Sequence, residues 1–228
     1  MINRSDKAVR FIELMQVKSG RMASMGSADS FTNDNVRRAI GQAHEDVAAS
    51  VNVIVRLAKD ETRTVPDVHH RGKREADTLV PKLLKARDTL RAEADNIENS
   101  AWTRINEKLA LDPTKVVIHQ LKLAWLTEQY ADPVKGLVEI NKQIKGDVEL
   151  GGLIVATPGY LMKMSEDVQR NFAATAINAH LPEAAEALKV AAQVRDTADK
   201  YDGVAKNVRS SFYLSEQAER YENTRVED

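Results

Sequence analysis

Histidines are the residues of this sequence best suited to acid–base chemistry or metal binding. The closest local match to a metal site is Asp67 with His70, three residues apart at the expected start of a helix and with His69 beside them. Helical di-metal sites need Glu-x-x-His pairs on two helices, and the sequence contains none. We therefore expect no metal and no cofactor, with His69 and His70 solvated near a helix N-terminus. The histidines are His44, His69, His70, His119 and His180.

Covalent catalysis finds little support in the sequence. Cysteine is absent, which excludes disulfides, thiolate catalysis and cysteine-ligated zinc. No Gly-x-Ser-x-Gly motif is present to hold a nucleophilic serine. Neighbouring carboxylates such as Glu45 and Asp46 are explained better by solvated helix faces. We expect no catalytic residues and no enzyme; a metal-dependent helical enzyme centred on Asp67 and His70 is the enzymatic alternative.

A basic stretch between residues 71 and 91 is the main candidate for binding phosphate. Its cations outnumber Glu75, Asp77 and Asp88, but at helical spacing they are spread round the helix, and no aromatic residue lies among them to stack on bases. A solvated polar face is the expected explanation, and a nucleic-acid-binding accessory protein remains the alternative function. The seven cations are Arg71, Lys73, Arg74, Lys82, Lys85, Arg87 and Arg91.

The composition indicates a folded helical protein. Hydrophobic residues make up 43% and aromatic residues only 5% of the 228 residues, so the core must consist mainly of Ala, Val, Leu and Ile. Lys and Arg total 33 against 34 Asp and Glu, so no strong field draws the chain toward nucleic acid or an anionic membrane. We expect no signal peptide, no membrane span and a cytoplasmic location.

Prolines and glycines divide the chain into segments of helical periodicity. Asp112-Pro113 and Asp132-Pro133 are typical helix starts, because Asp caps a helix N-terminus and Pro is tolerated in the first turn. The expected fold is an all-α bundle of about six to seven helices. It has a mobile N-terminal arm (1–33, with a linker from 19), a central bundle (34–182) and a coiled-coil-like helix with an acidic tail (183–228). The expected helices cover about 5–18, 35–58, 67–105, 113–130, 133–146, 159–180 and 184–212.

Two apolar segments of the central region lead to further predictions. Residues 113–130 carry apolar side chains on more than one face, which predicts the most buried helix. The run GGLIVATPGYLM at 151–162 is too short to span a membrane and lacks the spacing of a phosphate-binding loop. We expect it to be an extended connector with Leu153, Ile154 and Val155 in the core. A strand that pairs with another chain, or an exposed docking loop, is the alternative.

The last helix has the most regular pattern. Its apolar residues alternate three-residue and four-residue steps over four heptads, which predicts a close-packed seam. This seam could join copies of the chain or pack against the helix at 67–105. The predicted self-association seam consists of Ala184, Ala187, Ala191, Val194, Ala198, Tyr201, Ala205, Val208 and Phe212.

These patterns together favour a non-enzymatic structural or assembly protein that acts through helix-mediated protein contacts. We expect a repeated subunit or adaptor of a larger complex, such as a virion component or scaffold. The expected partner is another copy of the chain or a different protein subunit.

Overall fold

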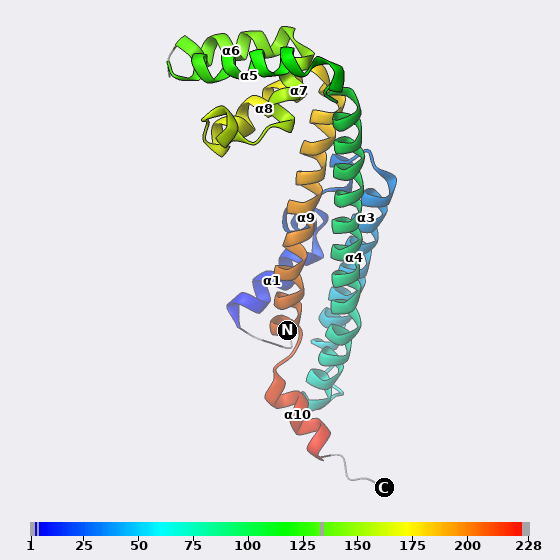
Figure 1. The fold of residues 1–228 in the computed structure, drawn as a ribbon. Helices are drawn as coiled ribbons and strands as arrows, with labels where there is room; N and C mark the ends of the chain where they lie inside the picture. The colour runs from blue at the N-terminus through cyan, green and yellow to red at the C-terminus, as the bar shows by residue number, and fades with distance from the viewer. Residues whose placement is uncertain (1–2, 4, 133–134, 225–228) are drawn as a thin grey trace. The chain divides into compact units, whose positions relative to one another are not determined.

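The computed structural model describes residues 3, 5–132 and 135–224. Over these residues the chain forms ten α-helices and three short 3-10 helices, with no strand (Figure 1). The all-α prediction is confirmed. None of the described helices is long and apolar enough to cross a membrane.

The chain divides into two compact units. Unit 1 comprises residues 1–95 and 192–228, and unit 2 comprises residues 96–191. The division falls elsewhere than the expected boundaries after residues 33 and 182. It lies inside two long helices, α4 (Val65–Lys108) and α9 (Pro182–Phe212), so each unit contains part of both.

Unit 1 is built round an antiparallel pair, α3 (Asp34–Leu57) and the first part of α4. Ser50 donates a hydrogen bond to Glu75 at 2.6 Å, and Asn35 donates one to Glu93 at 3.0 Å. Residue numbers rise along α3 as they fall along α4, which defines the antiparallel direction. The inward side chains of α3 recur at three-residue and four-residue steps and are buried, as the periodicity predicted; they include Val36, Ile40, Val47, Val51 and Ile54.

The second part of α9 lies antiparallel to α4 in unit 1 (Figure 1). Arg91 contacts Asp199 at 2.7 Å, and further along the pair Arg195 contacts Asp95 at 2.7 Å. The C-terminal helix α10 (Ser215–Thr224) also contacts α4, through an ion pair between Lys73 and Glu222 at 2.8 Å. Ion pairs along α4 therefore join segments 100 or more residues apart in sequence.

The N-terminal region differs from the expected arm and linker. Helix α1 (Asp6–Gln16) packs on α3, and residues expected to form the linker contain α2 (Lys18–Met25) and the 3-10 helix η1 (Ala28–Ser30). Two features explain this order. Met25 and Phe31 are buried, and the Arg21 guanidinium donates hydrogen bonds to the Met15 and Gln16 carbonyls at the end of α1. The linker prediction is therefore wrong over these residues.

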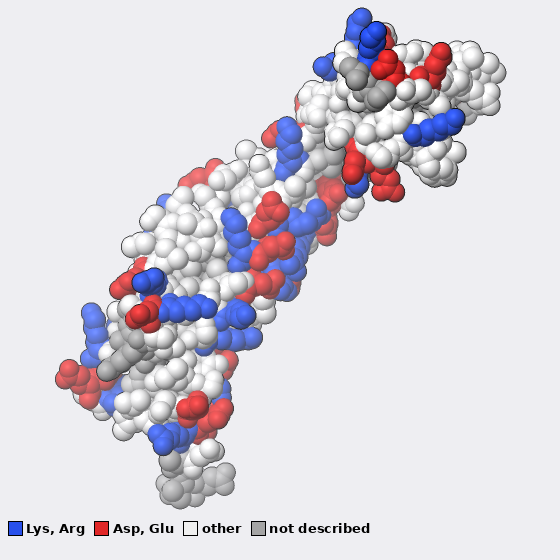
Figure 2. Space-filling model, turned by 90° about the vertical axis from the view of Figure 1, so that its left-hand side faces the viewer, with Lys and Arg blue, Asp and Glu red and all other residues white. Residues whose placement is uncertain are grey.

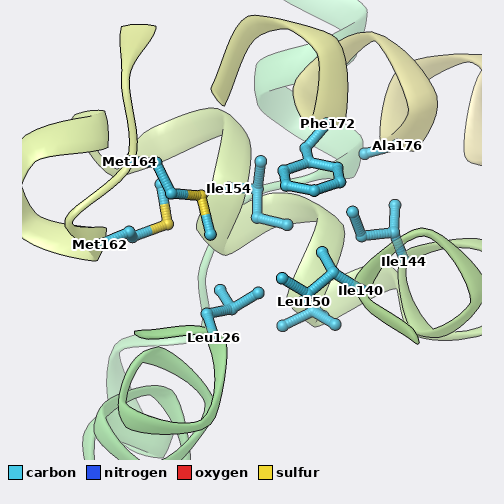
Figure 3. Close-up of a cluster of buried hydrophobic side chains, with 9 residues drawn as sticks. All are labelled: Leu126, Ile140, Ile144, Leu150, Ile154, Met162, Met164, Phe172 and Ala176. Atoms are coloured by element: carbon cyan, nitrogen blue, oxygen red, sulfur yellow. The ribbon is translucent and has the colours of Figure 1, made fainter. Parts of the chain in front are cut away.

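Unit 2 contains a bundle of short helices: α5 (Val116–Tyr130), α6 (Lys135–Gly146), α7 (Val148–Ala156) and α8 (Glu166–His180). Their side chains converge on one apolar core (Figure 3). The 3-10 helix η3 (Gly159–Met162) adds Met162 to it. The core residues are Leu126, Ile140, Ile144, Leu150, Ile154, Met162, Met164, Phe172 and Ala176.

The apolar run at 151–162 is not an extended connector. Its first half belongs to helix α7, in which Leu153 and Ile154 are buried as predicted and Val155 is half-buried. A β-carbon on Gly152 would lie 2.5 Å from the Leu109 carbonyl oxygen, so glycine permits α7 to pack closely there. The paired glycines made this run resemble a loop in the sequence. Glycine also occurs inside helices, however, where another backbone packs closely against it.

The helix number exceeds the expected six or seven for three reasons. Helix α2 replaces part of the linker, α7 replaces the connector, and α10 follows α9 in the region expected to be a frayed tail. Pro133 and Val134 of the expected fifth helix lie outside the described residues, as do the last four residues of the tail.

Candidate interaction surface on helix α5

Helix α5 begins at the predicted Asp-Pro signal. The Asp112 carboxylate accepts a hydrogen bond from the Thr114 backbone N–H at 2.9 Å, and Pro113 occupies the first turn. A 3-10 turn, η2 (Pro113–Lys115), leads directly into α5. The Asp112–Pro113 start is confirmed.

One face of α5 packs against the core of unit 2. His119 and Leu126 are buried, while Leu123 and Tyr130 are partly buried and contact the core. At 100° per residue these four side chains fall within an arc of about 60°. This arc is the inner face of α5.

The opposite face of α5 is also apolar, and most of it is exposed. Val117 is 69% exposed, Leu121 66% and Ile118 45%. These residues share an arc of about 100° with Trp125, which lies at the edge of the face, is half-buried and packs against the core of unit 2. We call Val117, Ile118, Leu121 and Trp125 the outer face of α5.

The sequence pattern revealed both faces, but the prediction drawn from it is wrong. Residues 113–130 were expected to form the most buried helix, whereas of the residues of α5 only His119 and Leu126 are buried. In unit 2, α5 contacts α6, α7 and η3. An apolar face indicates a surface that can be buried, and the described residues of unit 2 leave Val117, Ile118 and Leu121 exposed.

A groove of about 470 Å³ lies beside the outer face, between α5, α6 and α7. Its apolar lining comes from Ile118, Leu121, Trp125 and Leu150, and polar residues such as Gln129 and Gln143 complete it. Apolar surface with a polar border is typical of protein-binding sites.

Ion pairs fix the polar border of the groove. The Lys122 ammonium contacts the Asp147 carboxylate at 2.6 Å and that of Glu149 at 3.2 Å, and Lys115 also contacts Glu149. Burial alone would raise the pKa of Asp147, but hydrogen bonds from Lys122 and the Leu150 backbone N–H bring this pKa below its usual value. Asp147 also caps the N-terminus of α7, so it remains ionised and the border keeps its shape.

The predicted seam on α9 is buried within the chain. Ala187 is half-buried and the other eight residues are buried, with Val194, Ala198, Tyr201, Val208 and Phe212 at 0% exposure. The intramolecular alternative therefore describes this helix, and the seam offers no exposed surface for a second copy. Both possibilities give the same heptads, because periodicity shows which face is buried and not what covers it.

Most of the basic stretch is engaged in ion pairs within unit 1. Arg71 pairs with Asp67, Lys73 with Glu222, Lys82 with Asp46, Arg87 with Asp88 and Asp202, and Arg91 with Asp199 and Asp202. Among the described residues, Arg74 and Lys85 have no such partner. On the face shown in Figure 2, Lys and Arg side chains are interspersed with Asp and Glu. Lys and Arg do not form a continuous basic surface on that face.

The residues of the metal alternative are engaged in other contacts. The Asp67 carboxylate contacts Arg63 at 2.9 Å and Arg71 at 3.2 Å, while the His70 ring stacks on Tyr221 with 4.6 Å between centroids. His69, expected to be solvated, is buried, and its Nδ1 accepts a hydrogen bond from the Leu214 N–H at 3.0 Å. No group of three potential metal ligands occurs in the described part of the chain.

Comparison with protein-family models, with curated proteins and with solved structures found no match. The fold and the outer face of α5 are therefore the basis for inferring a function.

Proposed function

We propose that the protein is a non-enzymatic assembly subunit or adaptor that binds other protein subunits through the outer face of α5. The single observation that supports this proposal is that α5 is apolar on two opposite faces and its own unit covers only one. In unit 1 the long helices α4 and α9 instead pack against one another.

The outer face is better evidence for a binding surface than the other exposed apolar residues, because its side chains are adjacent to one another. Scattered apolar side chains are common on protein surfaces, so Val65 or Val148 alone means little. Val117, Ile118 and Leu121 are instead adjacent on one helix face, beside an apolar groove. Contiguous exposed apolar surface with a polar rim is typical of contacts with another macromolecule.

A charge on the outer face tests the proposal. We expect Leu121→Asp to reduce recovery of the co-purifying protein subunits at least tenfold when the tagged protein is isolated from its source cells, because an unpaired carboxylate would be buried in the contact. Gln120→Asp is the matched control: it puts the same charge on an exposed neighbouring residue outside the outer face.

Folding must be measured in parallel. We expect both variants to keep the far-ultraviolet circular dichroism and unfolding midpoint of the wild type, because both replaced side chains are exposed. If the stable Leu121→Asp protein retained all the subunits of the wild type, or if the wild type were recovered alone, the proposal would be wrong.

A further inference from the structure

We infer that unit 1 contains a binding site for a phosphate group, in a hollow lined by Lys18, Arg21 and His44. The hollow lies between α2, η1 and α3, and none of its lining residues belongs to the outer face of α5. The inference therefore goes beyond the proposed function and does not depend on it.

The hollow is large enough for a small ligand. Its volume is about 340 Å³, at the small end of the roughly 300 to 1,000 Å³ of ligand pockets. Gly41 of α3 lines it, and a β-carbon on Gly41 would meet no atom within 4 Å, so the space continues up to the helix backbone. The hollow therefore has room for a phosphate group and a few further atoms of the molecule that carries it.

Two buried polar atoms of the lining side chains lack a partner. Within the described part of the chain, Arg21 Nε and His44 Nε2 make no hydrogen bond. The rest of both side chains is held in place. Arg21 donates through Nη1 to the Met15 and Gln16 carbonyls, at 2.6 Å and 2.9 Å, and the His44 ring hydrogen-bonds the Gly26 backbone. Buried polar atoms nearly always have a partner, so these two point to a ligand in the hollow.

The surrounding charge indicates that this ligand is an anion. Arg21 supplies one positive charge, and Lys18, three residues earlier at the start of α2, supplies another. Burial is the main cause of the lowered pKa of His44, and the charges of Arg21 and Lys18 lower this pKa further. A bound anion would offset the repulsion among the three side chains and accept the hydrogen bond that Arg21 Nε leaves unused.

Two carboxylates, Asp29 of η1 and Glu45 of α3, also line the hollow. Both residues are exposed, and in the described structure neither pairs with Lys18 or Arg21. Water and salt screen exposed charges, whereas a buried donor needs an acceptor close to it. The carboxylates therefore border the site and leave its buried donor unsatisfied.

Phosphate fits this combination of groups better than a carboxylate does. It offers three strong acceptor oxygens, which can take hydrogen bonds from Lys18, from Arg21 and from the hydroxyl of Ser27 beside them. A phosphate that retains a proton can also donate to His44 Nε2, which accepts while the ring is neutral. Once the ring takes up a proton, the same nitrogen donates to the phosphate.

The ring of His44 reports on the site directly. We would titrate the full chain with inorganic phosphate, and separately with glycerol 3-phosphate, through the low millimolar range and follow the histidine ring C–H signals by NMR. The His44 signal, assigned from its absence in His44→Gln, should shift until it saturates, and the signals of the other four histidines should not. Tighter binding of glycerol 3-phosphate would identify an organic phosphate as the ligand, and otherwise free phosphate is the ligand. No saturable shift with either compound would overturn the inference.

A pair of lysine variants tests the role of the charge. We expect Lys18→Gln to weaken phosphate binding about tenfold, because it removes one charge-assisted hydrogen bond. Lys7→Gln is the matched control: Lys7 is exposed on α1 and does not line the hollow. Both variants should keep the unfolding midpoint of the wild type, since both lysines are exposed. Equal phosphate affinities for the two variants would contradict the site.

Filling the hollow is a test that changes no charge. Gly41→Leu should abolish phosphate binding, because its side chain would occupy the space that Gly41 leaves open. Gly203→Leu makes the same substitution at another helical glycine with open space around it, and this variant should bind phosphate as the wild type does. A folded Gly41→Leu protein with unchanged affinity would overturn the inference.

The pH dependence tests whether His44 contacts the anion. Sulfate is the suitable probe, because it keeps both charges where a phosphate group takes up a proton, near pH 6. Sulfate affinity should rise as the pH falls from 7.5 to 5.5, since only the protonated ring can donate to it. This rise should be absent in His44→Gln. The same rise in the wild type and in His44→Gln, or none in the wild type, would overturn the inference.

Discussion

At the scale of single residues, burial gives His69 a role in pH dependence. Burial lowers the pKa of His69 below its ordinary value of 6.5, because the interior disfavours the charged ring. The neutral ring is also the form whose Nδ1 can accept the hydrogen bond from Leu214 at the start of the segment that leads into α10. Folding therefore favours the neutral form of His69.

The sign of the pH effect follows. Above about pH 6.5 the ring is neutral in both the folded and the unfolded chain, and the stabilisation is complete. As the pH falls below that value and through the lower folded pKa, the unfolded chain takes up a proton first. We expect the free energy of unfolding to decrease over this range, and His69→Gln, whose amide oxygen can accept the same hydrogen bond, to decrease less.

Urea unfolding between pH 8 and pH 5 measures this difference. His44 provides the comparison, because burial and the nearby charge of Arg21 lower its pKa as well. A double variant of His69 and His44 should therefore have the flattest profile. Parallel profiles for the wild type and His69→Gln would count against this role of His69.

The ion-pair partners of the cations at residues 71–91 could not be predicted from the neighbouring sequence. Arg87 and Arg91 meet carboxylates on α9 more than 100 residues away, and Lys82 meets Asp46 on α3. The residue types and their helical spacing were visible in the sequence, but the partners depend on how three helices pack. The expectation of a solvated polar face was therefore incomplete.

At the scale of elements, two helical glycines are predicted to respond in opposite ways to alanine. A β-carbon at Gly72 of α4 would lie 2.4 Å from the Phe212 carbonyl oxygen at the end of α9, whereas one at Gly203 would meet no atom within 4 Å. We expect Gly72→Ala to destabilise unit 1 by about 1 to 3 kcal/mol through overpacking. Gly203→Ala should stabilise it by up to about 1 kcal/mol, because alanine favours a helix more than glycine does.

Chemical denaturation of the two variants beside the wild type checks this pair. Each is the control for the other, since the substitution is the same and both sites are helical. A stabilised Gly72→Ala protein would show that α4 and α9 do not approach closely at this point.

Helix prediction succeeded where apolar residues recurred at helical spacing with polar residues between them, as on α3. It failed at α2 and α7, where Gly, Ser and a continuous apolar run concealed the helical period. For α5 the two apolar faces were recognised, but the sequence does not state whether a face is covered by the same chain. The outer face of α5 thus required the structure, although its residues had already been noticed.

At the scale of the whole molecule, unit 2 is one continuous segment inserted between the two parts of unit 1. The ion pair between Asp95 and Arg195 places the ends of the unit 1 helices side by side. Replacing residues 96–191 by a short Gly-rich loop should therefore give a protein that folds as unit 1 alone. Its circular dichroism should be strongly helical, and its unfolding should be cooperative.

The same deletion supplies a check on the proposed function. Unit 1 without unit 2 should no longer recover the partner subunits, because the outer face of α5 belongs to unit 2. An unfolded deletion protein would show that unit 1 depends on the inserted segment.

The insertion also has a consequence for synthesis on the ribosome. The α4 surface that α9 contacts in unit 1 is translated first, and residues 192–212 of α9 are translated only after the whole of unit 2. Translation proceeds at about 5 to 20 residues per second, so roughly 6 to 20 s pass between the synthesis of α4 and that of this part of α9. During that interval the growing chain is a natural client for chaperones that bind exposed apolar helices.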